Sequence, residues 1–281
     1  MSILADIGGT FVRFARDEGG DPGGITKYKA EDFEGLEDAL ARYCEEQGRK
    51  TSGALRIATA GYEDGGVWKF VNNNKWVIDP AALEEKGWRV EIILNDFEAG
   101  VWALPGLNAE NMTTLKDAPG ASGSKCLFGP GTGLGLGYLH GGDAAPFVQK
   151  THGGHMPLAA RTDEQWTAAQ TIKAQVFEHV VSGPGLQKLR EIYDPDTALR
   201  LFHEFFGLFA ATAVISGNAY GGVYLTGGVL ESLIADDLFN FPLFEEWLCV
   251  QGAASVTRDL HATPIYHVID PYPALKGLLN A

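Results

Sequence analysis

Apolar and polar positions near the N-terminus follow a pattern that predicts strands around a tight turn. Residues 3–7 and 11–15 form two apolar runs separated by the glycines at 8–9, a pattern typical of a hairpin. Apolar side chains at helical spacing over residues 33–43 predict a helix, and residues 55–60 form another apolar run. The order strand, strand, helix, strand indicates an α/β fold.

The boundary at Asn95 and Asp96 is the most informative point in the first half of the chain. Residues 90–94 are an apolar, β-branched run that predicts a strand buried on both faces, and residues 97–104 carry apolar side chains at helical spacing. The polar pair therefore lies where a strand passes into a helix, the point at which open α/β sheets bind ligands. A carboxylate there can also be only a helix cap, so Asp96 has both interpretations.

Glycine occupies every second position over residues 129–137, directly after a predicted strand at 125–128. In an extended chain, alternate residues point to the same face, so glycine at every second position leaves one face without side chains. A phosphate or another backbone can then approach this face closely. The spacing matches neither a dinucleotide fingerprint nor a Walker loop. A phosphate loop and a tightly packed structural hairpin both remain open.

The second half of the chain predicts two helices and a closing strand. Residues 163–181 predict a helix with Glu178 near its end, and residues 199–215 form the most apolar helix. The latter contains charged residues and is too short for a membrane span, so we expect a core or interface helix. Residues 223–226 predict a strand that ends in a Gly-Gly turn at 227–228.

Composition and charge narrow the function classes. The chain has 281 residues, of which 45% are hydrophobic and 21% charged, enough for two soluble lobes. Its formal net charge of −14 argues against nucleic acid or an anionic membrane as partner. We expect a cytoplasmic protein, because no signal-peptide pattern opens the chain and Cys44, Cys126 and Cys249 are isolated. That spacing favours free thiols over a disulfide framework or a zinc site.

Three polar features suggest ligand chemistry. Asp6 enters the first glycine turn, where a carboxylate would repel phosphate unless it faces a metal ion or its bound water. The asparagine run at 72–74 is typical of a turn but also suits sugar hydroxyls. His152 and His155 invite a metal interpretation, although a glycine loop places them on no common helical face.

Six motifs, in this order, resemble the bacterial glucokinase family: Asp6-Ile7-Gly8-Gly9-Thr10, Leu94-Asn95-Asp96-Phe97, Gly129-Pro130-Gly131-Thr132-Gly133-Leu134-Gly135, Gly153-Gly154-His155, Ser182-Gly183-Pro184-Gly185-Leu186 and Thr226-Gly227-Gly228. The resemblance implies a two-lobed α/β protein of the actin-like, hexokinase-type ATPase fold with a central cleft. We expect one lobe at 1–97, rejoined by 269–281, and the other at 98–268. The implied function is ATP-dependent phosphorylation of a hexose-like sugar, by a homodimer.

The resemblance also implies roles for individual residues. Asp96 would be the general base that takes the proton from the sugar hydroxyl, and Asp6 would orient Mg²⁺ through a water. The positions that match sugar-binding residues are Asn73, Asn95, His152, His155 and Glu178. Those that match contacts to ATP are Gly8, Gly9, Thr10, Gly131, Thr132, Gly133, Gly227 and Gly228.

One position departs from the family pattern. His152 stands where glucokinases carry a glutamate that accepts hydrogen bonds from hydroxyls near the anomeric carbon. A neutral imidazole accepts only one hydrogen bond, so we expect glucose to be a poor substrate. Two alternatives are a sugar-binding protein with weak catalysis and a kinase of a small non-sugar acid. A DNA-binding regulator is not expected, because the cysteine cluster of repressor-type sugar kinases is absent.

Overall fold

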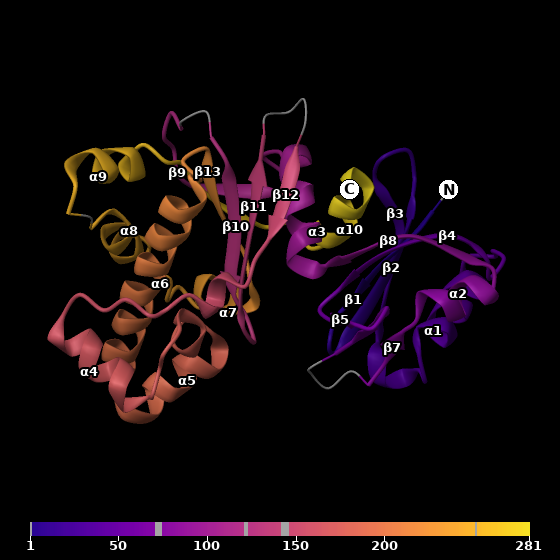
Figure 1. The fold of residues 1–281 in the computed structure, drawn as a ribbon, viewed down its shortest axis with the longest axis horizontal. Helices are drawn as coiled ribbons and strands as arrows, with labels where there is room; N and C mark the ends of the chain where they lie inside the picture. Colours follow the sequence, from indigo (N-terminus) through magenta and orange to yellow (C-terminus); the bar gives the residue numbers. More distant parts are fainter. Residues whose placement is uncertain (1, 71–74, 121–122, 142–145, 251) are drawn as a thin grey trace. The chain divides into compact units, whose positions relative to one another are not determined.

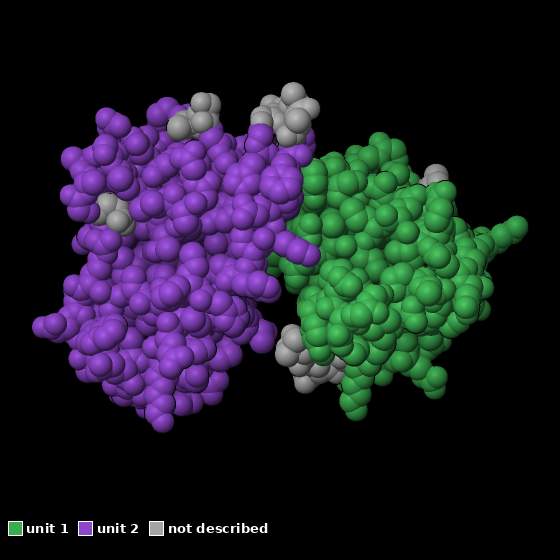
Figure 2. Space-filling view, in the orientation of Figure 1, with its two compact units in different colours: residues 1–106, 271–281 green, residues 107–270 purple. Residues whose placement is uncertain are grey.

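The computed structural model describes residues 2–70, 75–120, 123–141, 146–250 and 252–281. Contacts divide the chain into unit 1, Met1–Gly106 with Pro271–Ala281, and unit 2, Leu107–Asp270 (Figure 2). The expected division after residue 97 would separate Asp96 from most of the helix that it begins. Close packing explains why this helix stays in unit 1: a Cβ on Gly277 would overlap the carbonyl oxygen of Ala99.

Unit 1 is built on a five-stranded sheet (Figure 1). Its strands, in spatial order, are β3 (Pro22–Lys29), β2 (Phe11–Asp17), β1 (Ile3–Ile7), β4 (Gly53–Thr59) and β8 (Trp88–Asn95). β1, β4 and β8 are parallel, and their registers align Ile7, Thr59 and Asn95. The carboxyl ends of these three strands therefore lie at one edge of the sheet.

Helices cover both faces of this sheet. Ile3, Ala5 and Ile7 pack in one core cluster with residues of α1 (Leu36–Glu46) and α2 (Pro80–Glu85). Leu4, on the opposite face of β1, packs in another cluster with α3 (Asp96–Ala103) and α10 (Pro273–Asn280). This alternation is the period of two that a strand imposes on its side chains. The remaining elements of unit 1 are η1 (Ala30–Asp32), η2 (Leu104–Gly106) and a small sheet of β5 (Tyr62–Asp64), β6 (Val67–Lys69) and β7 (Val77–Ile78).

Unit 2 contains a six-stranded sheet. Its spatial order is β12 (Phe147–Lys150), β11 (Leu134–His140), β10 (Lys125–Pro130), β13 (Gly222–Leu225), β14 (Ile265–Val268) and β9 (Met112–Lys116). β10, β13 and β14 are parallel, and β11 returns antiparallel to β10. The glycine-rich stretch therefore lies in a hairpin, an arrangement that the sequence had left open beside a phosphate loop.

Helix α6 (Pro195–Gly217) forms the centre of the core of unit 2. Its fully buried aromatic side chains are Phe202, Phe205, Phe206 and Phe209. Among the described residues it is the one helix long and apolar enough to cross a membrane, but 78% of the apolar window is buried inside the protein. It is a core helix, one of the two possibilities expected from the sequence. The other helices of unit 2 are η3 (Gly153–His155), α4 (Asp163–Thr171), η4 (Phe177–His179), α5 (Gly183–Ile192), α7 (Gly228–Ala235), α8 (Phe241–Cys249) and α9 (Ala254–His261).

The helix predicted at 163–181 is wrong in its second half. α4 ends at Thr171, because Lys173 adopts a left-handed conformation with φ of 57° and the amide of Ala174 donates to the carbonyl of Ala169. Val176 is extended, and Glu178 then lies in the short helix η4. The spacing of apolar residues carries no information on a positive φ at a lysine. The sequence pattern therefore could not predict that the helix ends before Lys173.

Candidate active site

In unit 1, β8 and α3 position the Asn95-Asp96 pair. Asn95 is the N-cap of α3, and its side-chain oxygen accepts a hydrogen bond from the Phe97 amide at 3.0 Å. Asp96 is the first residue of the helix, and its Oδ1 accepts from the same amide at 2.9 Å. Asn95 already caps the helix, so the cap interpretation alone does not account for a carboxylate at Asp96.

The surroundings of Asp96 raise its pKa to about 6. Burial is the largest cause, because it penalises the charged form, and the negative charge of Asp6 adds to the rise. The hydrogen bond from Phe97 works in the opposite direction. Asp96 is consequently a carboxylate whose basicity suits proton transfer near neutral pH.

Asp6 is paired with a residue that the sequence analysis did not single out. β1 and β2 are antiparallel with Asp6 opposite Arg13, and an Arg13 nitrogen lies 2.9 Å from Oδ2 of Asp6. The two side chains are only 15% and 25% exposed. Burial raises the pKa of Asp6, and the guanidinium of Arg13 opposes that rise. In a hairpin that turns at Gly8 and Gly9, the residue opposite Asp6 can be counted from the turn, and this count could have identified Arg13.

The Gly8-Gly9 turn follows β1 directly. Gly8 donates its N–H to the carbonyl of Phe11 at 2.9 Å, and Thr10 is exposed at the tip. A pocket of about 390 Å³ opens beside the turn. Its lining residues are Gly9, Thr10, Ala30, Glu31, Phe33, Glu34, Lys75 and Trp76. Asn73, predicted to bind sugar, lies outside the described residues.

In unit 2, the turn between β10 and β11 combines packed and open glycines. A Cβ on Gly129 would overlap the carbonyl oxygen of Thr226, so this glycine is required for strand packing. A Cβ on Gly133 would lie 2.6 Å from a carboxylate oxygen of Glu178. At Gly131 an added Cβ would meet nothing within 4 Å. The packed-hairpin interpretation therefore describes Gly129, while the backbone of Gly131 has the open face that a phosphate loop needs.

Two helix N-termini lie beside this turn. The Gly183 amide at the start of α5 donates to the Gly131 carbonyl at 2.8 Å, and α7 begins at Gly228, after Gly227 whose φ of 107° favours glycine. Helix N-termini carry partial positive charge and orphan N–H groups. A pocket of about 770 Å³ opens here, lined by Gly131, Thr132, Gly183, Pro184, Leu186, Gln187, Arg190, Gly228, Val229, Ser232, Leu233 and Asp236. Gln187, Arg190, Ser232 and Asp236 were not anticipated from the sequence.

The structure also brings Glu178 and the two histidines together. Oε2 of Glu178 accepts a hydrogen bond from the Leu134 amide at 2.8 Å, and Oε1 lies 3.7 Å from Nε2 of His155. The rings of His152 and His155 meet edge to face, with centroids 6.4 Å apart. Both histidines are exposed, which leaves them accessible to a ligand.

The predicted residues thus fall into two groups, one in each unit. Unit 1 holds Asp6, Gly8, Gly9, Thr10, Asn95 and Asp96. Unit 2 holds Gly131, Thr132, Gly133, His152, His155, Glu178, Gly227 and Gly228. The first group offers carboxylates and a glycine turn, and the second offers open backbone, helix N-termini and a polar cluster, which together are the groups that phosphoryl transfer to a hydroxyl requires.

Comparisons with known proteins identify a kinase family whose reaction requires these groups. The Glucokinase family model matches residues 3–195 and 192–281. The glucokinase of Marinobacter nauticus is 28% identical over 316 residues, covering 100% of this chain and 96% of that protein. The structure of glucokinase from an Antarctic psychrotroph has a TM-score of 0.82 at 22% identity, over 99% of this chain and 97% of that one. A ROK family glucokinase from Streptomyces griseus, in complex with glucose and AMPPNP, has a TM-score of 0.56 at 19% identity, over 99% and 97% of the two chains. The architecture is accordingly that of the actin-like ATPases, and this chain belongs to the glucokinase family as an ATP-dependent sugar kinase.

Proposed function

We propose that this sugar kinase transfers the γ-phosphoryl group of ATP to a hydroxyl of a hexose or related sugar, with Asp96 as general base. The observation that carries this proposal is the position of Asp96 at the end of β8, with a pKa raised to about 6. A carboxylate of that basicity is largely ionised at pH 7 and accepts a hydroxyl proton more readily than an ordinary aspartate.

Asn95 would hold the sugar beside the base. Its side-chain oxygen accepts from Phe97, so its amide NH₂ group is oriented away from the helix start and can donate to a neighbouring hydroxyl. In this arrangement the helix cap fixes the rotamer of Asn95, and the sugar is positioned against Asp96 without further ordering. Such positioning accounts for much of the rate gain in phosphoryl transfer.

Asp6 would contribute on the phosphate side. Arg13 engages Oδ2 of Asp6, which leaves Oδ1 as a hard oxygen acceptor for a water of Mg²⁺. When bound, Mg²⁺ neutralises charge on the phosphates and the leaving group. The amides of the Gly8–Thr10 turn would contact phosphate oxygens, because the glycines leave that backbone unshielded.

ATP would bind to unit 2 at the pocket between α5 and α7. The open backbone at Gly131 and Gly228 allows close approach of a phosphate or a flat nucleoside, since no neighbouring atom lies within 4 Å of a Cβ at either position. The N-termini of α5 and α7 favour negative charge there. The AMPPNP complex of the Streptomyces griseus relative supports this assignment of a nucleotide.

His155, Glu178 and His152 would recognise the sugar, together with Asn73. Glu178 can accept hydrogen bonds from hydroxyls, and the ring of His155 nearby supplies either a donor or an acceptor. His152 replaces the family glutamate and lowers the number of acceptors near the anomeric carbon. We therefore infer a preferred sugar that differs from glucose at or near that carbon. The three free, buried cysteines support a reducing compartment, the cytoplasm, and the homodimer rests on the family resemblance alone.

A coupled assay of ADP formation over a panel of hexoses and their derivatives tests the proposal. We expect ADP release with at least one sugar, dependence on Mg²⁺ or Mn²⁺, and loss of roughly two to four orders of magnitude in turnover in Asp96→Ala. Exposed Asp117→Ala provides the matched control and should retain full turnover. Near-normal turnover in Asp96→Ala would show that Asp96 is only a structural residue, and activity in excess chelator would remove the metal from the proposal.

A further inference from the structure

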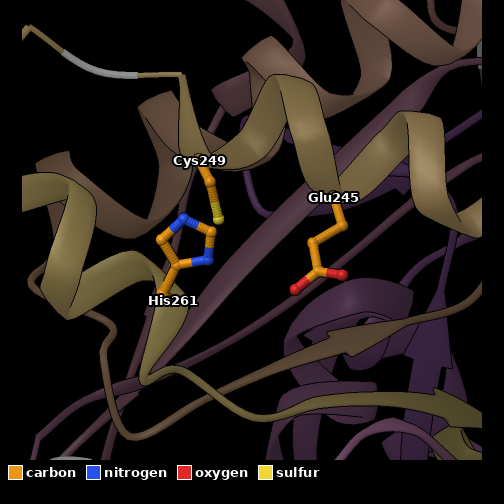
Figure 3. A group of neighbouring side chains, drawn as sticks. All are labelled: Glu245, Cys249 and His261. Atoms are coloured by element: carbon orange, nitrogen blue, oxygen red, sulfur yellow. The ribbon is translucent and has the colours of Figure 1, made fainter.

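Three side chains with metal-binding atoms come together on α8 and α9 of unit 2, apart from every residue assigned to catalysis or substrate (Figure 3). Glu245 and Cys249 are one helical turn apart on α8, and His261 is the last residue of α9. One ligand atom from each lies within 4.8 Å of the other two. Figure 3 shows the sulfur of Cys249 facing the imidazole ring, with the carboxylate of Glu245 directed toward the same space.

Helix geometry accounts for two of the three positions. Residues at i and i+4 share one face of a helix, so Glu245 and Cys249 present their ligand atoms side by side. α8 is held in place by buried Phe244 and Leu248, which pack in the core with α6. Glu245 and Cys249 therefore hold two of the three ligand positions on one rigid helix, and the end of α9 places His261 beside them.

The donor set has a clear chemical preference. Thiolate, imidazole and carboxylate are the protein ligands of Zn²⁺, with bonds of about 2.0–2.3 Å in a tetrahedral arrangement. Tetrahedral ligand atoms at such bond lengths are about 3.4–3.8 Å apart, so ligand atoms that lie within 4.8 Å of one another need to close by at most about 1.4 Å. His261 is exposed, so its side chain has space to rotate toward the other two ligands. A hard ion such as Mg²⁺ would not select the sulfur.

Lys116 completes the surroundings of the cluster. Its ammonium group lies 2.9 Å from Oε1 of Glu245 and donates to the Leu260 carbonyl at 3.4 Å, immediately before His261. Ligating carboxylates are usually hydrogen-bonded through a second oxygen in this manner, which fixes their orientation. Oε2 of Glu245 then remains for a metal ion. A bound Zn²⁺ would offset the thiolate and the carboxylate, and the ammonium of Lys116 leaves one positive charge beside the site.

The other two cysteines lack this arrangement. Cys44 and Cys126 are buried and, within the described parts of the chain, belong to no group of three potential ligands. Of the three cysteines, Cys249 is the one that forms such a group with an imidazole and a carboxylate among the residues that the structure describes. The isolation of the cysteines along the chain favours free thiols over zinc, and the docking of α9 against α8 changes that interpretation for Cys249.

We propose that Glu245, Cys249 and His261 form a binding site for a single Zn²⁺ or similar borderline transition-metal ion, with water as the fourth ligand. The site joins α8 to α9 and stabilises this part of unit 2. The exposure of His261 gives the ion a route from solvent. The site is independent of the Mg²⁺ that accompanies ATP, since neither Asp6 nor Asp96 takes part.

Metal titrations of the 281-residue chain, first stripped with chelator, test the proposal. Co²⁺ should produce a thiolate-to-cobalt charge-transfer band at one equivalent, and Zn²⁺ should abolish that band. Competition with a fluorescent zinc chelator should show at least about a tenfold loss of Zn²⁺ affinity in Cys249→Ser and in His261→Ala. The Zn²⁺-dependent rise in Tm should disappear in both variants.

Two matched variants act as controls. Glu246→Gln changes an exposed carboxylate beside Glu245, and His179→Ala removes an exposed imidazole elsewhere in unit 2; both should bind Zn²⁺ as the unmodified protein does. If Cys249→Ser fails to fold, the exposed His261→Ala still decides the question. Absence of the charge-transfer band, or Zn²⁺ affinity unchanged in His261→Ala, would overturn the proposal.

Discussion

Arg13 lies opposite Asp6 across the β1–β2 hairpin, with a guanidinium nitrogen 2.9 Å from the carboxylate. This pair lies at the start of the glycine turn, where phosphate is proposed to bind. Arg13 thus offsets the charge of Asp6, which would otherwise be buried beside a second carboxylate, Asp96. Two acidic groups near a phosphate site require such compensation, and Mg²⁺ would add to it.

Arg13→Gln should therefore reduce both stability and turnover. Removing one partner of a largely buried ion pair leaves an uncompensated charge and costs on the order of 3 kcal/mol, which Tm from thermal unfolding would reveal. The double variant Asp6→Asn/Arg13→Gln should recover much of the stability but not the turnover, because the carboxylate is still missing. Full turnover in the double variant would show that Asp6 and Arg13 form a purely structural pair.

The pH dependence of catalysis should report on Asp96. Its raised pKa means that protonation removes the base as the pH falls through about 6, so kcat/KM should decline below that value and reach a plateau above it. An ordinary aspartate would place the decline near its usual value of about 3.9. A kcat/KM profile with a saturating ATP concentration checks this, and a plateau extending well below pH 5 would contradict the assignment of Asp96 as base.

The ionised carboxylate of Asp96 should also lower the stability of the fold by a measurable amount. A pKa raised in the folded state stabilises the fold below the unfolded-state pKa, and that contribution is lost as the pH rises through about 6. Asp96→Asn keeps the Oδ1 acceptor for Phe97 and removes the charge, so Tm should increase by a few degrees at pH 8, on the order of 1 kcal/mol. At pH 4 the increase should vanish. An equal change in Tm at both pH values would mean that ionisation of Asp96 is not the cause.

The boundary between strand and helix at Asn95 and Asp96 could be predicted from the chain alone, because the apolar run before it is continuous. β8 is an edge strand in which Leu94 is buried and Ile92 and Ile93 are only partly buried, so the expected burial on both faces is incomplete. The sequence could not show that Gly129 is packed and Gly131 is open, because both are glycine. Only the contact of Gly129 with the chain at the end of β13 distinguishes them. The left-handed Lys173 and the docking of His261 against Cys249 likewise depend on three-dimensional contacts. Local periodicity thus predicts elements, while contacts between elements decide which residues meet.

Gly129 and Gly131 provide a matched pair of substitutions on one hairpin. Gly131→Ala should fold with an unchanged Tm, because its Cβ meets nothing within 4 Å, but the methyl group should obstruct phosphate and raise KM for ATP by roughly tenfold, the effect of a mismatched contact. Gly129→Ala should lower Tm markedly, because its Cβ overlaps the Thr226 carbonyl. Steady-state kinetics with varied ATP tests the first variant. An unchanged KM for ATP in Gly131→Ala would separate this turn from the nucleotide.

His152 should set the preference among sugars. A lost acceptor for a sugar hydroxyl costs on the order of 1–3 kcal/mol, or roughly ten- to a hundredfold in affinity, so the unmodified protein should use glucose poorly. His152→Glu should raise kcat/KM for glucose, since it restores the acceptor that the family pattern carries. The side chain of His152 is exposed, so a glutamate fits at this position. The next two residues, Gly153 and Gly154, are packed so closely that a Cβ at either would overlap β11. The loop is therefore held against the strand, and the substitution should alter recognition without shifting the backbone. Exposed His179→Glu serves as the control. Efficient glucose turnover by the unmodified protein, unchanged or lowered in His152→Glu, would show that this position does not determine specificity.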